Sequence, residues 1–262
     1  MKLLLINSSA RAGGNTARVM DLYEVAFSAL ARELGVEIET EQVNLSRLSP
    51  KTCLGCRACF DLGEEKCPLH DELLPLRDRL LTADGYVIAS PVYVEDVNSV
   101  MKNWIDRMAF TSHRPALFGK TALLYTTCGI GSSNHALRTM QTAFGTWAMK
   151  TIIGGKYRLG AITEPEEIRR RYAKQISRSA RRLVSSIQKK PFRPSLYSLI
   201  AFTVQQTYWR RNKAYFNTFD YAFWNSAGWL DNGRRYYDPA MARSLRASVA
   251  RLLGKFVALF FG

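Results

Sequence analysis

The chain has 262 residues, of which 47% are apolar, and it carries a formal net charge of +15. This apolar share excludes an intrinsically disordered protein, which lacks the apolar surface needed to offset the entropy lost on ordering. The first apolar run, Leu3–Ile6, is too short for a signal-peptide core or a membrane span, so we expect a cytoplasmic protein.

The excess positive charge is concentrated in the last third of the chain. Residues 1–164 hold 18 Lys or Arg against 17 Asp or Glu, whereas residues 165–262 hold 19 against 5. The second segment therefore carries +14 of the total +15. Such a surface favours acidic partners, which include proteins, anionic membrane faces and nucleic acids.

Short apolar runs alternate with helical patterns along the first 190 residues or so. Lys2–Asn7 is nearly all apolar and is followed by polar residues and glycine, which is typical of a strand buried on both faces of a parallel sheet. The sequence predicts further strands at 36–45, 86–90, 121–126 and within 151–162. This alternation predicts an α/β fold with a doubly wound, five-stranded parallel sheet.

Helical periodicity fills the gaps between these strands. Apolar residues recur at helical spacing over 16–34 and the pattern stops at Gly35; further helices are predicted at 72–82, 98–110, 134–149 and 166–188. The two prolines within Lys189–Pro194 cannot continue the last helix. We therefore predict one domain over 1–190 with an inserted four-cysteine loop (49–70). A basic, aromatic-rich helical extension over 191–262 would pack on it or on a second subunit.

The loop after the first strand has the composition of a phosphate-binding loop. Ser8–Thr16 is rich in hydroxyls and small residues and opens directly onto a helix, so backbone N–H groups and the helix N-terminus both favour an anion. The loop lacks the Lys-Ser/Thr ending of a P-loop and the glycine spacing of a dinucleotide fold. It predicts a mononucleotide phosphate site, with an ordinary strand-to-helix turn as the alternative.

Two later loops are expected to meet the first at the edge of the sheet where ligands of doubly wound folds bind. After the third strand, Ser90–Asn98 offers a rigid proline turn and the aromatic face of Tyr93. After the fourth strand, Thr126–Ser133 contains glycines that allow a flat ligand to lie close to the backbone. The three loops together therefore favour a nucleotide with a flat ring.

Four cysteines form the most specific motif of the chain. Cys53, Cys56 and Cys59 have C-x2-C-x2-C spacing and Cys67 directly precedes a proline, as in loops that bind iron–sulfur clusters. A structural zinc site is one alternative, although zinc usually takes two separated C-x2-C pairs. Free thiols that cap the ligand site are the other. The spacing favours a cluster.

The first loop, the segment Ser90–Tyr93 and the segment Met101–Arg107 together resemble the flavodoxin-like NAD(P)H-dependent FMN reductase family. The cysteine loop resembles that of the iron–sulfur flavoproteins within this family. The resemblance covers roughly residues 1–185 and implies a flavodoxin-like sheet, FMN, NAD(P)H as a donor, and a homodimer or homotetramer. The first loop departs from the family by having Ser8 in place of glycine and Ala10 in place of proline. Neither change removes a hydrogen-bond donor, so we still expect FMN.

The resemblance also implies roles for individual residues. The FMN phosphate would be held by Ser9, Arg11, Asn15 and Thr16, the isoalloxazine by Pro91, Val92 and Tyr93, and the far side of the flavin by Thr127, Cys128, Gly129 and Gly131. A [4Fe-4S] cluster would be bound by Cys53, Cys56, Cys59 and Cys67. No side chain is assigned as catalytic, because the flavin carries the chemistry and the sequence contains no hydrolase triad.

The other polar candidates receive structural roles or none. We expect Asp71 to be the N-cap of the helix that begins at Glu72, and His70 to be a surface or packing residue. Cys128, a lone thiol in the third loop, is expected to pack rather than to react. His113 and His135 have no acid or nucleophile at a recognisable spacing.

The basic extension suggests several partners. Its arginine and lysine pairs suit solvated helix faces or the docking of an acidic electron carrier such as ferredoxin. Residues 248–261 combine Arg251 and Lys255 with leucines and phenylalanines, which favours peripheral contact with a membrane surface. Nucleic-acid binding is the main non-enzymatic alternative, but no recognisable module supports it.

These observations predict an FMN-dependent oxidoreductase. It would pass electrons between NAD(P)H or a reduced protein carrier and a small-molecule or protein acceptor. One alternative is an FMN or quinone reductase whose cysteine loop holds structural zinc or free thiols. Another is a basic protein that binds nucleic acid or a membrane surface.

Overall fold

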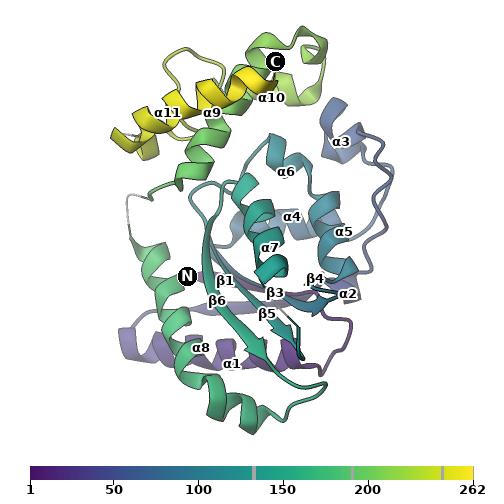
Figure 1. Cartoon of the computed structure of the whole chain (residues 1–262), viewed down its shortest axis with the longest axis vertical. Helices are drawn as coiled ribbons and strands as arrows, with labels where there is room; N and C mark the ends of the chain where they lie inside the picture. The colour runs from purple at the N-terminus through teal and green to yellow at the C-terminus, as the bar shows by residue number, and fades with distance from the viewer. Residues whose placement is uncertain (132–133, 190–191, 243–244, 262) are drawn as a thin grey trace.

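A parallel sheet forms the centre of the molecule in the computed structural model, which describes residues 1–131, 134–189, 192–242 and 245–261. Within these residues, five parallel strands lie in the order β2-β1-β3-β5-β6 (Figure 1). They are β1 (Lys2–Asn7), β2 (Glu39–Asn44), β3 (Gly85–Tyr93), β5 (Thr121–Cys128) and β6 (Lys150–Arg158). The two-residue strand β4 (Asp96–Val97) pairs antiparallel with the end of β3. This order is flavodoxin-like, as the sequence predicts.

Helices cover both faces of the sheet, which explains why the central strands β1, β3 and β5 are almost entirely buried, whereas the edge strand β2 is mostly polar. On one face lie α1 (Asn15–Leu34) and α8 (Pro165–Gln188), packed on Leu3, Leu5 and their neighbours. On the other lie α4 (Leu73–Thr82), α5 (Ser99–Arg107) and α7 (Asn134–Thr146), packed on Leu4, Ile6 and their neighbours. The short segments on this side are α2 (Leu45–Leu48), α3 (Ala58–Asp61), η1 (Glu64–Lys66) and α6 (Phe110–His113).

The extension is helical and packs against the sheet domain, in agreement with the first of the two expected arrangements. It comprises α9 (Leu196–Arg211), η2 (Lys213–Tyr215), α10 (Phe219–Ser226), η3 (Pro239–Ala242), α11 (Leu245–Val257) and η4 (Ala258–Phe261). Its aromatic core contacts the sheet domain where Phe118 stacks on Tyr237, with ring centroids 5.6 Å apart. The predicted domain boundary at 190/191 lies outside the described residues. Among the described helices, none combines the length and apolar composition needed to cross a bilayer.

The predicted helix over 98–110 is two helices in the structure. The first, α5, ends at Arg107, and the chain turns at Met108 before α6 begins at Phe110. The turn lets two arginines, Arg107 and Arg114, both reach the cysteine loop, where each donates to a backbone carbonyl.

Candidate functional site

A cavity lies at the carboxyl ends of β1, β3, β5 and β6, as expected for a doubly wound sheet. We call it the strand-end cavity. Its lining contains all the predicted flavin-site residues except Gly131, together with Gly14, Gly160 and Ala161. The full lining is Ser9, Arg11, Gly14, Asn15, Thr16, Pro91, Val92, Tyr93, Thr127, Cys128, Gly129, Gly160 and Ala161. The loop after β6 was not predicted to contribute, because Gly160 and Ala161 carry no recognisable motif.

The N-terminus of α1 makes one end of this cavity suitable for an anion. Gly14 caps α1, and among the described residues no side chain accepts from the first free N–H groups of this helix. A Cβ atom at Gly14 would lie 2.9 Å from Cβ of Arg11, so only glycine fits this close turn. The exposed guanidinium of Arg11 makes no hydrogen bond or ion pair with any residue that the structure describes. Free amides and a free cation together provide donors for a phosphate.

Two of the predicted phosphate residues have their side chains engaged within the protein. The Asn15 side chain donates to the Gly160 carbonyl at 2.7 Å and accepts from the Thr163 N–H at 2.9 Å. The Thr16 and Thr127 hydroxyls are hydrogen-bonded at 2.7 Å. These contacts join the loops after β1, β5 and β6, so Asn15 and Thr16 shape the cavity in addition to any contact with a ligand.

Asn98 fixes the loop after β3 against the loop after β1. Its buried side chain donates from Nδ2 to the Ser8 carbonyl at 2.7 Å, and its Oδ1 accepts from the Met101 N–H at 3.2 Å as the N-cap of α5. A single side chain thus caps a helix and joins two loops. Sequence reasoning placed Asn98 at a helix start but gave no sign of the contact with Ser8, which lies 90 residues away.

The rim of the cavity contains a strained turn. Val94 and Glu95 connect β3 to β4 with φ values of 48° and 67°, a left-handed conformation that is unfavourable for a β-branched residue. This turn leaves Tyr93 half-exposed at the cavity, where its ring can stack on a flat ligand. Cys128 is buried and lines the cavity, and its thiol lies 3.5 Å from the Gly131 carbonyl. Gly131 therefore lies next to the cavity but does not line it.

The four clustered cysteines all line a second cavity of about 120 Å³, which we call the cysteine cavity. Cys53 and Cys56 are exposed, whereas Cys59 and Cys67 are partly buried. The rest of the wall is largely apolar and includes Leu54, Phe60, Leu69, Leu73 and Phe110. Burial, reinforced by the neighbouring Cys67, raises the pKa of the Cys59 thiol to about 11. A thiolate at this position therefore requires a positive partner such as a metal.

Residues from α5 hold both ends of the cysteine loop. Arg107 forms a buried ion pair with Asp71 at 2.7 Å and donates to the Lys51 and Leu69 carbonyls. Asn103 accepts from the Cys53 N–H at 3.2 Å. Asp71 was predicted to be an N-cap, but the N-cap position of α4 is Glu72. The Asp71 carboxylate does accept from the first-turn N–H of Leu73 at 3.1 Å, and its main partner is Arg107.

Burial on its own would raise the pKa of the Asp71 carboxyl. Hydrogen bonds from Arg107, Lys51 and Leu73 outweigh that effect and lower the pKa below its usual value. Asp71 is therefore a stable counter-ion for Arg107 and leaves the guanidinium charged beside the Cys67 sulfur, 3.9 Å from Nη2.

A single metal ion and a cluster require different spacings of the four sulfurs. Among the described residues, no three Cys, His, Asp or Glu side chains gather closely enough to hold one metal ion. A tetrahedral zinc site with Zn–S bonds of about 2.3 Å needs sulfurs about 4 Å apart. A [4Fe-4S] cluster separates its four thiolates by roughly 6 Å, since each sulfur binds a different corner of the cube. Four cysteines that line one cavity supply the number of thiolates that either centre takes.

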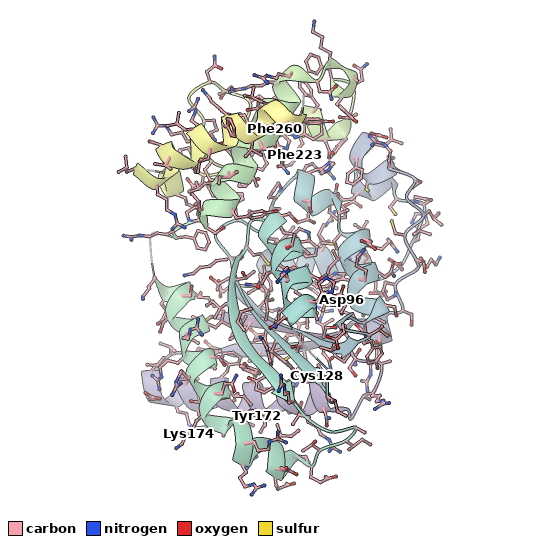
Figure 2. The ribbon with its side chains drawn as sticks, viewed as in Figure 1. Asp96, Cys128, Tyr172, Lys174, Phe223 and Phe260 are labelled. Atoms are coloured by element: carbon pink, nitrogen blue, oxygen red, sulfur yellow. The ribbon has the colours of Figure 1, made fainter. Side chains whose placement is uncertain are left out.

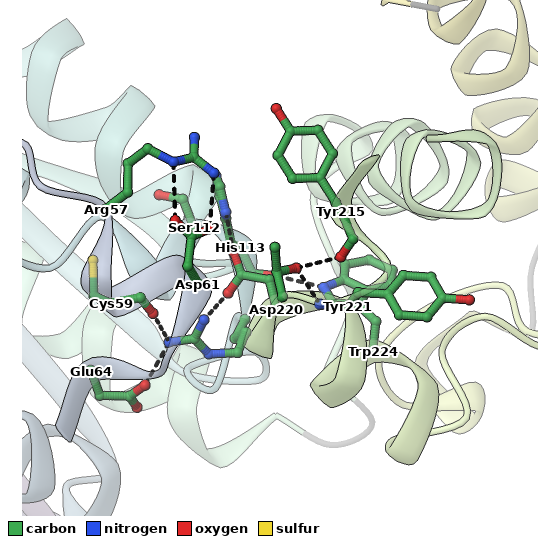
Figure 3. A network of polar contacts seen from close by, with 12 residues as sticks. Arg57, Cys59, Asp61, Glu64, Ser112, His113, Tyr215, Asp220, Tyr221 and Trp224 are labelled. Carbon is green, nitrogen blue, oxygen red and sulfur yellow. Dashed lines mark hydrogen bonds and ion pairs between the residues drawn. The ribbon is translucent and has the colours of Figure 1, made fainter. Parts of the chain in front are cut away.

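A buried network of charges joins the cysteine loop to the extension (Figure 3). Arg114 donates to the Cys59 carbonyl at 3.0 Å and pairs with Glu64 on one side and Asp220 on the other. The side chains of Arg114 and Asp220 are only 3% and 1% exposed. His113 Nδ1 lies 2.6 Å from the same Asp220 carboxylate. This arrangement places three segments of the chain around one guanidinium.

His113 thus has an acidic partner that the sequence did not reveal, because Asp220 lies 107 residues away. Burial, with Arg114 and Arg57 nearby, lowers the pKa of the imidazole to about 4. We infer a neutral ring that donates to a carboxylate already paired with Arg114. His135 lies 3.5 Å from Asp96 on the surface, and His70 is exposed as expected.

A third cavity, of about 250 Å³, lies between the cysteine loop and the extension. We call it the aromatic cavity, since its walls include Phe60, His113, Tyr208, Trp209 and Tyr215. Phe60 stacks on His113 with centroids 4.3 Å apart, and the Arg57 guanidinium lies 5.7 Å from the Tyr215 ring centroid. Arg57 and Phe60 also line the cysteine cavity, so the two cavities share a wall.

Comparisons with known sequences agree with this arrangement. Residues 1–163 match the model of the family described as NADPH-dependent FMN reductase. An iron-sulfur flavoprotein from Archaeoglobus fulgidus is 27% identical over 233 residues, covering 88% of this chain and 100% of the relative. One from Methanocaldococcus jannaschii is 36% identical over 107 residues, covering 41% of this chain and 51% of the relative. An FMN-dependent NADH:quinone oxidoreductase from Shewanella loihica is 29% identical over 162 residues, covering 55% and 80%.

Solved structures support the fold. An oxidoreductase from Corynebacterium diphtheriae superposes with a TM-score of 0.53 at 22% identity, covering 70% of this chain and 94% of the other. RosB superposes with a TM-score of 0.54 at 19% identity, covering 73% and 82%. At these identities the likeness shows a common fold and no more.

The charge network predicts that Asp220→Asn destabilises the protein. The substitution leaves the buried Arg114 with Glu64 alone, and breaking a buried ion pair costs roughly 3–5 kcal/mol. Urea unfolding should show this loss, whereas Asp231→Asn, at an exposed position in the same extension, should change the free energy of unfolding by about 0.5 kcal/mol or less. Equal stability of the two variants would show that Asp220 does not hold the extension in place.

Proposed function

The chain belongs to the NADPH-dependent FMN reductase family and is a flavin-dependent oxidoreductase, and from this premise we propose that FMN binds in the strand-end cavity. The protein would pass electrons between NAD(P)H, or a reduced protein carrier, and a small-molecule or protein acceptor. The observation that carries the proposal is the N-terminus of α1 beside Arg11, both without a side-chain partner in the part of the chain that the structure describes, at one end of a cavity built by four strand-end loops.

The residues of the cavity suit the parts of FMN. The α1 amides and Arg11 would bind the phosphate, Pro91, Val92 and Tyr93 would contact one face of the ring, and Thr127–Gly129 would contact the other. Bound FMN supplies the hydride and electron chemistry. The protein orients the ring and restricts the access of water, and no side chain needs to act as a nucleophile.

We expect Arg11→Ala to weaken FMN binding roughly 10–100-fold, because a hydrogen bond to a charged group contributes about 1.5–3 kcal/mol. Riboflavin, which has the same ring and lacks the phosphate, should bind the variant and the unaltered protein equally. Both affinities are measured by quenching of flavin fluorescence in titrations of the apoprotein.

Arg32→Ala is the matched control, because Arg32 is an exposed arginine in the last turn of the same helix. It should bind both flavins as the unaltered protein does. If Arg11→Ala weakened riboflavin as strongly as FMN, Arg11 would not be a phosphate ligand; if no flavin bound the unaltered protein, the proposed function would be wrong.

We further propose that Cys53, Cys56, Cys59 and Cys67 bind a [4Fe-4S] cluster. The proposal is supported by the cavity that all four cysteines line and by relatives named iron-sulfur flavoproteins. Arg107 lies beside the Cys67 sulfur and Arg114 donates to the Cys59 carbonyl, so both arginines fix the loop that carries the thiolates. A bound cluster would exchange single electrons.

An anaerobic preparation should contain about four iron and four sulfide per chain. Cys59→Ser should reduce both, because it removes a partly buried ligand, whereas Cys128→Ser should leave both unchanged because Cys128 lines the other cavity. Elemental analysis and visible absorption measure the outcome. If the analysis found stoichiometric zinc and no sulfide, the cysteines would form a structural zinc site and the cluster proposal would be wrong.

The aromatic cavity is our proposed docking place for a small acceptor, which deepens the proposed electron transfer. A flat aromatic molecule could stack between the rings there, with a carbonyl group towards Arg57, which pairs with Asp61 and also lines the cysteine cavity. An acidic protein carrier such as ferredoxin, attracted by the basic extension, is the alternative acceptor.

Anthraquinone-2-sulfonate is a suitable water-soluble probe because its ring system is flat and aromatic and carries two carbonyl groups. We expect saturable binding by equilibrium dialysis, weakened about tenfold in Tyr215→Ala through loss of a stacking wall and unchanged in Tyr197→Ala, which alters a half-exposed tyrosine elsewhere. Flavin content is measured on the same samples. Normal flavin content without probe binding would reject the acceptor site and leave the flavin proposal intact.

A further inference from the structure

The helix α11 buries its small residues and exposes its large apolar ones. Ala247, Ala250 and Gly254 face inward and pack on α9, and Ala258 continues this face into η4. A Cβ atom at Gly254 would lie 2.6 Å from Cβ of Thr203, which shows how closely α11 approaches α9. Close packing through small side chains leaves no room for the larger apolar residues of α11 on the buried side.

Those larger residues form one continuous stripe on the outer surface, which we call the α11 stripe. It consists of Leu245, Val249, Leu252, Leu253, Phe256, Leu259 and Phe260, spaced to fall on a single helix face. Leu252 is 71% exposed, Phe256 62% and Phe260 76%. Folded monomers rarely leave so many large apolar side chains together in water, so the stripe is expected to meet a partner.

The surroundings of the stripe are basic. No Asp or Glu follows Asp238 in the sequence, whereas Arg243, Arg246, Arg251 and Lys255 do. At the start of α11, Arg246 lines a cleft together with Lys150 and Arg193, and the lining of this cleft contains no acidic residue. Residues 192–262 hold ten Lys or Arg against three Asp or Glu, one of which is the buried Asp220.

We propose that the α11 stripe lies in the surface of an anionic lipid bilayer. The apolar residues would enter the boundary between headgroups and acyl chains, and the flanking arginines and lysines would attract lipid phosphates, as in other interfacial amphipathic helices. The charge of the surface decides against a second copy of this chain as the partner. Two copies with a charge of +15 each would bring the same basic surfaces together, whereas an anionic bilayer is complementary to them.

The position of α11 is compatible with electron transfer at a membrane surface. Figure 2 shows Phe260 at one end of the molecule and Cys128, a wall of the strand-end cavity, towards the other. Docking through the stripe would therefore leave the strand-end cavity open to soluble molecules. The docking proposal does not depend on the flavin or on the cluster.

The test is flotation of the full chain with vesicles of phosphatidylcholine alone or of phosphatidylcholine with about one third phosphatidylglycerol. We expect the protein to float with the anionic vesicles at low salt. The fraction that floats should fall several-fold when NaCl is raised to about 0.5 M, because salt screens the attraction. Binding to neutral vesicles should be at least about tenfold weaker. Equal flotation with both vesicles, or none with either, would overturn the proposal.

Variants of the α11 stripe test whether membrane binding needs its apolar side chains or only the positive charge of the protein. Leu252→Gln with Phe256→Gln should reduce flotation about tenfold without changing thermal unfolding, since both side chains are exposed. Val25→Gln, at an exposed apolar position on α1, is the control and should float normally. Normal flotation of the double variant would overturn the proposal. So would sedimentation of the vesicle-free protein as a dimer that this variant converts to a monomer.

Discussion

The junction between the cysteine loop, α6 and the extension in the upper part of Figure 1 depends on the neutralisation of one buried cation, Arg114. An ion of this size costs several kcal/mol to bury without a partner, so the guanidinium can be removed from water only where carboxylates meet it. Glu64 comes from the cysteine loop and Asp220 from the extension, and neither segment is adjacent to Arg114 in the chain. Satisfying this charge therefore requires both segments to close over α6 at the same time.

The same constraint explains how the cysteine loop keeps its shape with so little regular structure. Only the single turns α3 and η1 form within it. Its ends and its middle are instead held by side chains of the sheet domain: Asn103 and Arg107 bind the backbone before and after the cysteines, and Arg114 binds the Cys59 carbonyl. The backbone that carries the thiols is thus held by two side chains of α5 and by Arg114, which follows α6. Both arginines are paired with carboxylates, so they fix the loop without adding net positive charge to it.

Features that depend on local sequence could be predicted, whereas contacts between residues far apart in the chain could not. The central strands could be predicted because a strand covered on both faces is apolar along most of its length, as Leu3–Ile6 are. The strand-end loops could be predicted because parallel strands end at one edge. The contacts of Asn98 with Ser8 and of His113 with Asp220 could not, since each joins residues about a hundred apart and neither pair has a local signature. The family assignment rested on the first kind of signal and is confirmed by the family match over residues 1–163.

The helix α11 shows a further limit of periodicity as a guide to the core. An apolar face at helical spacing is ordinarily assigned to the interior, and the leucines and phenylalanines of α11 fit that pattern. The structure assigns the interior to the alanines and Gly254, because α9 lies too close for anything larger. Periodicity therefore identifies the two faces of a helix, whereas the distance to the neighbouring helix decides which face is buried. Where the small residues are the buried ones, the large apolar residues stay exposed and are available to a partner outside the chain.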